Sequence, residues 1–140
     1  MIRRMFSLAA FSADWAVLLL RVIFCGLMLY NHAFVKLALF RDNPESFPDP
    51  LGFGSSISFY LVLFAEMICG ALVLVGLFTR WALIPLMITM SVAVLRIHWE
   101  NDITDKELPL LYLAVYAAIF LLGPGRFSVD DRVARRMEWG

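Results

Sequence analysis

Long apolar runs separated by short polar segments dominate the chain. Four of them are long enough to cross a bilayer as helices, because about 20 residues at about 1.5 Å per residue cover the hydrocarbon core. The predicted spans are about 15–39, 57–77, 81–97 and 108–122. The runs are continuous rather than alternating, which favours helices over a membrane barrel. The pattern predicts an all-α integral membrane four-helix bundle, with a single transmembrane domain over residues 1–140.

Both ends of the chain are predicted to lie at the membrane surface as short amphipathic segments. Arg3 and Arg4 precede an apolar stretch that imitates a secretion signal, but its interruption favours an uncleaved interfacial segment. Near the other end, Ser128 is placed to cap a helix with Asp131 at its third position. Apolar residues at 129, 133 and 137 then share one face, which predicts a surface helix; a frayed polar tail is the alternative.

Composition and charge agree with a membrane protein. Of 140 residues, 61% are hydrophobic and 17% are charged, which leaves too little polar surface for a soluble domain. Twelve basic and twelve acidic side chains cancel, so no bulk attraction to nucleic acid is expected. Seven basic residues on the side of the termini against four opposite predict that both termini are cytoplasmic. The two sets are Arg3, Arg4, Arg80, Arg126, Arg132, Arg135 and Arg136, against Lys36, Arg41, Arg96 and Lys106.

The second span carries a single charge, Glu66. A carboxylate at the centre of a membrane helix costs about 2.5–3.5 kcal/mol on insertion scales, so its default interpretation is functional. The first span runs outward and the second inward, which brings Lys36 and His32 to a similar depth as partners. Glu66 could serve only as a structural tie between helices. Otherwise a carboxylate in this setting could carry a proton.

Polar side chains from all four spans are expected in the outer half of the membrane, because consecutive spans run in opposite directions. We expect Glu66, His32 and His98 to perform the acid–base chemistry of catalysis. The predicted cofactor-binding residues are Lys36, Arg96, Glu107, Tyr112 and Tyr116. Simpler alternatives exist: a histidine can bind a backbone carbonyl and do nothing more, and the tyrosines can be packing residues.

A stripe along the first span supports this grouping. Its members are Arg21, Cys25, Met28, His32 and Lys36. At helical spacing they form a band about 80° wide, and a band that holds the ionisable groups of a membrane helix should face the bundle interior. Arg21 lies at the cytoplasmic end, however, where it could instead reach lipid phosphates.

Other chemistry has weaker support. A zinc or iron site could draw on His32, His98, Glu66 and Glu107, but their spacing matches no compact ligand motif. Cys25 and Cys69 could pair, although packing is favoured and the sequence contains no Cys-x-x-Cys. Thr104 and Glu107 are predicted to form a capping box for the fourth helix. The proline-rich loop between the first two spans could act as a lid or as a docking strip for a partner.

Several motifs resemble the DoxX family over about residues 15–131. In the spans they are Leu20-Arg21 and Gly26 followed by His32 and Lys36, then Glu66 with Gly70. Between and after the spans they are Gly76-Leu77-Phe78-Thr79-Arg80, Lys106-Glu107 and the closing Gly123-Pro124-Gly125-Arg126-Phe127-Ser128-Val129-Asp130. The ordered set carries the resemblance, because no single motif is specific.

The resemblance implies a small membrane protein of bacteria or archaea. Some DoxX-like proteins are subunits of redox assemblies, including one that passes electrons from thiosulfate to quinone. It therefore favours the bacterial inner membrane, a quinone as candidate cofactor and a protein partner with redox centres. Contacts with the lipid bilayer are expected as well, and contacts with further copies of the chain stay open. It also implies that the family's polar positions are Arg21, His32, Lys36, Glu66, His98 and Glu107. Three functions stay open: a redox subunit, a membrane anchor or assembly subunit with a structural polar core, and a small transport component.

Overall fold

The computed structural model describes residues 12–100 and 102–138, and all regular structure in these residues is helical. The first long helix runs from Ala13 to Phe40, the second from Ser55 to Val75 and the third from Thr79 to Ile97. Two further helices follow, α7 (Ile103–Leu122) and α8 (Val129–Glu138), and a short 3₁₀ turn at Pro44–Ser46 lies in the first loop. The all-α prediction is confirmed for this part of the chain.

The long helices are composite. Their α-helical parts are α2 (Ala13–Leu20), α3 (Phe34–Phe40), α4 (Ser55–Leu63), α5 (Gly70–Val75) and α6 (Thr79–Val92). Their π-helical parts are Arg21–Cys25, Met28–Ala33, Phe64–Cys69 and Ala93–Ile97. These wider turns carry Arg21, His32, Glu66 and Arg96. π-helical turns are frequent at functional sites, and here they coincide with polar residues that the sequence identifies as candidates for a site.

Within the described residues, three helices are long and apolar enough to cross a membrane: Ala13–Phe40, Ser55–Val75 and Thr79–Ile97. The fourth predicted span corresponds to α7, which has 20 residues but begins at Ile103 rather than near residue 108. Its first turns contain Asp105, Lys106 and Glu107, so its composition is less apolar than that of the other three. The count of four spans therefore stays a prediction.

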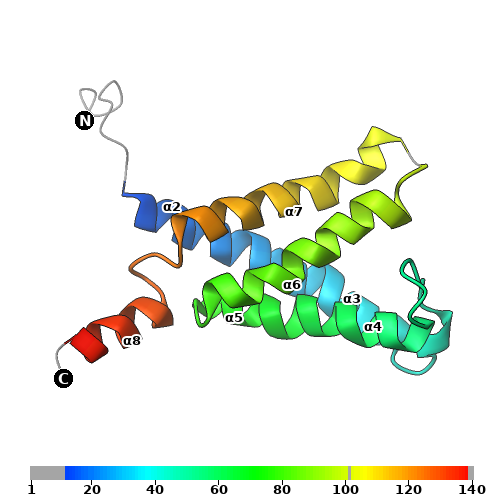
Figure 1. Cartoon of the computed structure of the whole chain (residues 1–140), viewed down its shortest axis with the longest axis horizontal. Coiled ribbons are helices and arrows are strands. Elements are labelled where there is room, and N and C mark those ends of the chain that lie inside the picture. The colour runs from blue at the N-terminus through cyan, green and yellow to red at the C-terminus, as the bar shows by residue number, and fades with distance from the viewer. Residues whose placement is uncertain (1–11, 101, 139–140) are drawn as a thin grey trace.

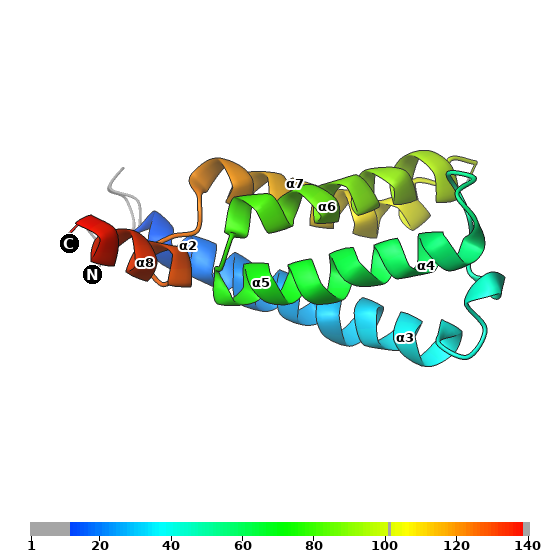
Figure 2. The ribbon, with the colours of Figure 1, turned by 60° about the horizontal axis from the view of Figure 1, so that its bottom comes forward.

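The helices pack as an elongated bundle, with α6 and α7 side by side along their length (Figures 1 and 2). The first helix contacts α5 through its Arg21–Cys25 turn and contacts Phe64–Cys69 through its Met28–Ala33 turn. Both figures show α3 diverging from α7 toward the end that carries the first loop. The core residues lie between these helices and include Met28, Val73, Leu83, Leu86, Tyr112, Tyr116 and Ile119.

The first loop is fixed on the helix ends. Phe47 is buried between Phe40 and Phe59, with ring centroids 5.1 and 5.6 Å away. Asp49 accepts hydrogen bonds from the backbone amides of residues 52–54 and from the Ser58 hydroxyl. The loop therefore has a defined shape and covers the ends of the first two helices.

The two predicted caps have different outcomes. The Ser128 hydroxyl accepts a hydrogen bond from the backbone amide of Asp131 at 3.1 Å, so the cap of α8 is confirmed. The capping box of Thr104 and Glu107 is wrong, because Thr104 is already the second residue of α7 and no side chain caps that helix at Asp102. Figures 1 and 2 show α8 extending beyond the end of the bundle. The predicted N-terminal surface segment lies outside the described residues.

Candidate functional site

A buried charged pair joins the first and second helices. The Lys36 ammonium of α3 donates to Glu66 Oε1, which projects from the Phe64–Cys69 turn. The Glu66 side chain is fully buried, whereas 28% of the Lys36 side chain is exposed. The matching depths predicted either Lys36 or His32 as the partner of Glu66, and the structure shows Lys36. The pair places a carboxylate and an ammonium inside the bundle where the first two helices meet.

Two polar atoms near this pair have no hydrogen-bond partner among the described residues. They are Glu66 Oε2 and the Tyr116 hydroxyl, and both are buried. The rings of Tyr116 and His32 both contact Tyr112, and His32 lies one helical turn from Lys36, the partner of Glu66, so the two unpaired atoms belong to one cluster of side chains. Folded proteins leave few buried polar groups unpaired, because each costs about 1–3 kcal/mol. This arrangement leaves one acceptor and one hydroxyl available to a small polar ligand or a proton.

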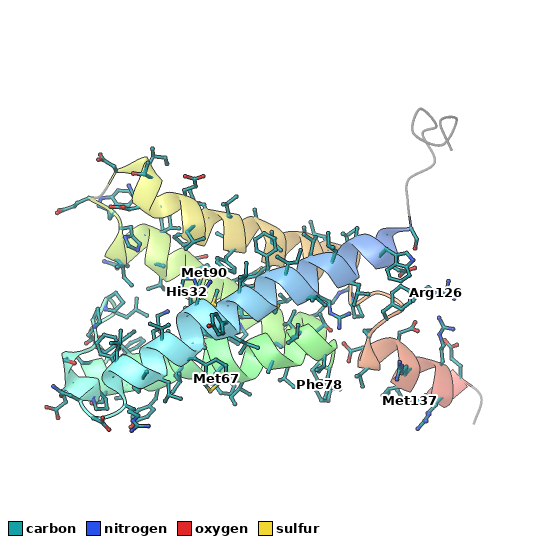
Figure 3. All side chains as sticks on the ribbon, turned by 180° about the vertical axis from the view of Figure 1, so that it is seen from behind. His32, Met67, Phe78, Met90, Arg126 and Met137 are labelled. Carbon is teal, nitrogen blue, oxygen red and sulfur yellow. The ribbon has the colours of Figure 1, made fainter. Side chains whose placement is uncertain are left out.

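A row of rings connects the first helix with α7. The His32 ring meets Tyr112 edge-on with centroids 5.5 Å apart, and Tyr112 lies 5.8 Å from Tyr116. Phe24 also packs edge-on against Tyr112, with centroids 5.6 Å apart. His32 lies in the middle part of the first helix, far from Arg126 and Met137 (Figure 3). We name the group the buried polar cluster: His32, Lys36, Glu66, Tyr112 and Tyr116.

The other three predicted site residues lie toward the loop ends of their helices. Arg96 is exposed in the last turn of the third helix, and Glu107 is exposed in the first turns of α7. His98 is half-buried just after the third helix, where its backbone amide donates to the Ala93 carbonyl at 3.0 Å. The structure therefore brings five of the eight predicted residues together, and the catalytic and cofactor-binding roles assigned to all eight stay predictions.

The described residues do not gather a metal-binding set. No three His, Cys, Asp or Glu side chains lie close enough in residues 12–100 and 102–138 to hold a metal ion together. The set considered above, which joined both histidines with Glu66 and Glu107, is not assembled in this structure. Cys25 and Cys69 are buried in the hydrophobic core as separate thiols, which agrees with a packing role.

A second buried charge, Arg21, lies toward the end of the bundle that carries the termini. Its side chain is 1% exposed and donates from Nε to the Val73 carbonyl at 2.8 Å. Its two terminal nitrogens donate to the carbonyls of Leu74 and Pro124 at 2.9 and 2.8 Å. A cation is favoured at the free carbonyls of a helix C-terminus, which α5 offers here. Of the two positions left open for Arg21, the inward-facing one is the one observed, and the alternative of a contact with lipid phosphates is wrong, because these carbonyls hold the side chain inside the protein.

Asp130 and Gly76 form further contacts at the Arg21 end of the bundle, and the sequence did not predict them. The Asp130 carboxylate accepts from the backbone amides of Phe78 and Thr79 at 2.7 and 2.9 Å and from the Thr79 hydroxyl at 2.8 Å. Gly76 has φ +77°, and a Cβ there would lie 2.5 Å from Arg21. No spacing rule predicts the contact between Asp130 and Thr79, which lie 51 positions apart. The available signal was that residues 76–80 and 123–130 both belong to motifs that resemble the DoxX family.

The fold and these contacts define an α-helical membrane protein with two buried charges, one of them only partly paired. The DoxX family model matches residues 16–99, and the chain belongs to the DoxX family. The matched region contains four residues of particular interest, namely Arg21, His32, Lys36 and Glu66. The tyrosines of α7 and the closing motif lie beyond it.

One relative comes from Haemophilus influenzae and is named only as an uncharacterized protein. It is 27% identical over 101 residues, which cover 69% of this chain and 67% of the relative. No solved structure matches the chain. The comparisons therefore show the family to which the chain belongs, and they do not indicate an activity.

Proposed function

We propose that the chain is an integral membrane subunit of a redox system, and that the buried polar cluster exchanges protons with a quinone. The observation that supports this proposal is the pair of unpaired buried atoms, Glu66 Oε2 and the Tyr116 hydroxyl. A quinone needs hydrogen-bond donors at its carbonyl oxygens and takes up two protons with two electrons to become a quinol. The Tyr116 hydroxyl can donate to such a carbonyl oxygen, and Glu66 can deliver a proton once it is itself protonated.

Each member of the buried polar cluster has a proposed role. Glu66 and His32 pass protons, and the Lys36 ammonium stabilises the negative charge of a partly reduced quinone. Tyr116 and Tyr112 donate hydrogen bonds and pack against the ring. The electrons come from a partner protein with redox centres. Access is from the side of Lys36, whose side chain is the partly exposed member of the ion pair.

The proposed topology has α7 as the fourth span and both termini in the cytoplasm of a bacterium, with the bundle in the inner membrane. The length of α7, 20 residues, and its packing along α6 support a membrane-crossing position. The basic residues around the end with the termini support the orientation. His98, Arg96 and Glu107 then lie near the outer surface. The exposed apolar side chains of the bundle face lipid or other copies of the chain.

The test measures bound quinone in the full chain purified in mild detergent, by extraction and mass spectrometry. The variants are Glu66→Gln and Tyr116→Phe, with Glu138→Gln and Tyr60→Phe as controls at exposed positions. We expect about one quinone per chain in the wild type and the controls, and a loss of about ten-fold or more in the two cluster variants, since a lost hydrogen bond to a charged group is worth about 1.5–3 kcal/mol.

A folded protein without quinone in every sample would contradict the proposal and favour a membrane anchor or assembly subunit. One observation favours that second function: the Lys36–Glu66 pair also ties two helices together. An anchor would bind its partner equally well with Glu66→Gln, because the amide can keep a hydrogen bond to Lys36. Co-purification of the partner with both forms separates the two functions.

A further inference from the structure

A groove runs along the outward side of α6, away from the core. It has a volume of about 330 Å³ and its apolar walls include Ile84, Ile88, Leu95 and, from the first loop, Leu51. Ile84 and Ile88 are exposed, whereas Leu83 and Leu86 of the same helix are buried in the core. The groove therefore opens on the outer surface of the bundle, away from the core that α6 helps to form. Its size falls within the range of about 300–1,000 Å³ that is typical of small-molecule sites.

The loop end of the groove is charged. Arg96 lines the groove and also a second hollow of about 270 Å³, which it shares with Trp99 and Glu100. Arg96 and Glu100 are exposed, and neither forms an ion pair with another described residue. The Trp99 carbonyl accepts a hydrogen bond from the Lys106 ammonium at 2.8 Å, which ties this wall to α7. The second hollow thus presents one cation and one anion next to an apolar groove.

The length of the groove matches one leaflet of a bilayer. From Ile84 to Arg96 the helix rises about 18 Å, slightly more than half of a hydrocarbon core of about 30 Å. Arg96 then lies near the boundary between hydrocarbon and headgroups, where a guanidinium meets phosphate. A chain of methylene groups that begins at this boundary would reach the middle of the membrane within the groove.

The walls of the groove are already in place. Leu51 belongs to the turn that the Asp49 carboxylate holds with hydrogen bonds to the amides of Gly52, Phe53 and Gly54. The Ser91 hydroxyl, which also lines the groove, donates to the Met87 carbonyl at 2.8 Å and so has its partner within the helix. The middle of the groove is therefore suited to bind hydrocarbon, and only its loop end is suited to bind a charged group.

We propose that this groove binds a phospholipid whose headgroup carries both a phosphate and a primary ammonium, as in phosphatidylethanolamine. One acyl chain lies along α6, the phosphate binds Arg96, and the ammonium binds Glu100. The presence of both charges in the second hollow favours this headgroup over a purely anionic one. The inference does not rest on the proposed redox function, because the groove and the buried polar cluster lie on different sides of the bundle.

The test uses the full chain in vesicles that contain equal amounts of phosphatidylethanolamine, phosphatidylglycerol and phosphatidylcholine with identical acyl chains. After mild solubilisation, native mass spectrometry counts the lipids that remain on the protein. We expect phosphatidylethanolamine to be retained preferentially. Arg96→Gln should lower the retention of all three lipids by about ten-fold, the effect of losing one charge-assisted hydrogen bond. Glu100→Gln should remove the preference for phosphatidylethanolamine over phosphatidylglycerol.

The matched control is Arg41→Gln, which removes an exposed arginine at the same end of the molecule but outside the groove. It should leave retention unchanged. Ile88→Trp, which fills the groove and keeps both charges, should lower retention as Arg96→Gln does, and circular dichroism should show each variant to be folded. Equal retention of the three lipids by the wild type, preference for phosphatidylglycerol, or an equal loss in Arg41→Gln would overturn the proposal.

Discussion

Arg21 and Glu66 are both charged, both buried and both carried by π-helical turns, yet their surroundings differ. Three nitrogens of Arg21 donate to three backbone carbonyls from two segments of the chain. Glu66 has one oxygen paired with Lys36, and its other oxygen has no partner among the described residues. A well-paired buried charge serves the fold, whereas a partly paired one keeps binding capacity for something else. The comparison indicates a structural role for Arg21 and supports the chemical role that we propose for the buried polar cluster.

The largest effect should come from Arg21→Gln. The change removes hydrogen bonds to the carbonyls of Val73, Leu74 and Pro124, and we expect it to lower the free energy of unfolding by about 4 kcal/mol. Denaturation of the protein in mild detergent, followed by circular dichroism, measures this loss. Arg80→Gln is the control, since Arg80 is exposed and has a single hydrogen bond, to the Phe120 carbonyl. An equal loss of stability in both variants would contradict the structural role of the buried Arg21 side chain.

A smaller effect is expected for Lys36→Met. It leaves the Glu66 carboxylate without its partner, at a cost of about 2–3 kcal/mol, because the partial exposure of Lys36 reduces the penalty for a buried unpaired charge. The double variant with Glu66→Gln should recover most of this stability, since no buried charge is left. Glu66→Gln alone should change stability by about 1 kcal/mol or less. If the double variant is no more stable than Lys36→Met, the loss of stability does not come from an unpaired Glu66 carboxylate.

Tyr116→Phe should alter stability still less. The hydroxyl that it removes is buried without a partner, so the unfolding free energy should stay within about 1 kcal/mol of the wild type or rise. Quinone retention should nevertheless fall. Tyr60→Phe, at an exposed position, is the matched control for both measurements. A marked loss of stability in Tyr116→Phe would show that the hydroxyl has a structural partner.

The smallest effect concerns the first loop and its pH dependence. The Ser58 hydroxyl and the amides of the turn lower the pKa of Asp49 below its usual range. A lowered pKa means that the carboxylate stabilises the folded loop above the usual carboxyl pKa, and that this contribution is lost as the pH falls through the lowered value. The protection of the amides of residues 52–54, measured as the exchange rate relative to the intrinsic rate at the same pH, should therefore fall at acid pH. Asp49→Asn should show faster exchange already at neutral pH, and unchanged exchange would contradict this account.

Much of the fold could be predicted because a membrane helix needs a continuous apolar run of about 20 residues, which is visible directly in the sequence. The depth of Glu66 along those runs was enough to predict Lys36 or His32 as its partner, and the stripe on the first helix predicted which face of that helix points inward. The partners of Arg21 could not be predicted, because they are backbone carbonyls, which every residue has. The contact of Asp130 with Thr79 depends on how two distant turns meet. The early start of α7 was missed because charged residues form its first turns.

The central claim is that Glu66 handles protons in a quinone site. Infrared difference spectroscopy of the full chain, loaded first with a short-tailed quinone and then with the corresponding quinol, tests it directly. The account predicts a change in the carbonyl band of a protonated carboxyl group between the two states, and no such change in Glu66→Gln. A difference spectrum that is the same in wild type and Glu66→Gln, or a protein that binds neither quinone nor quinol, would contradict it.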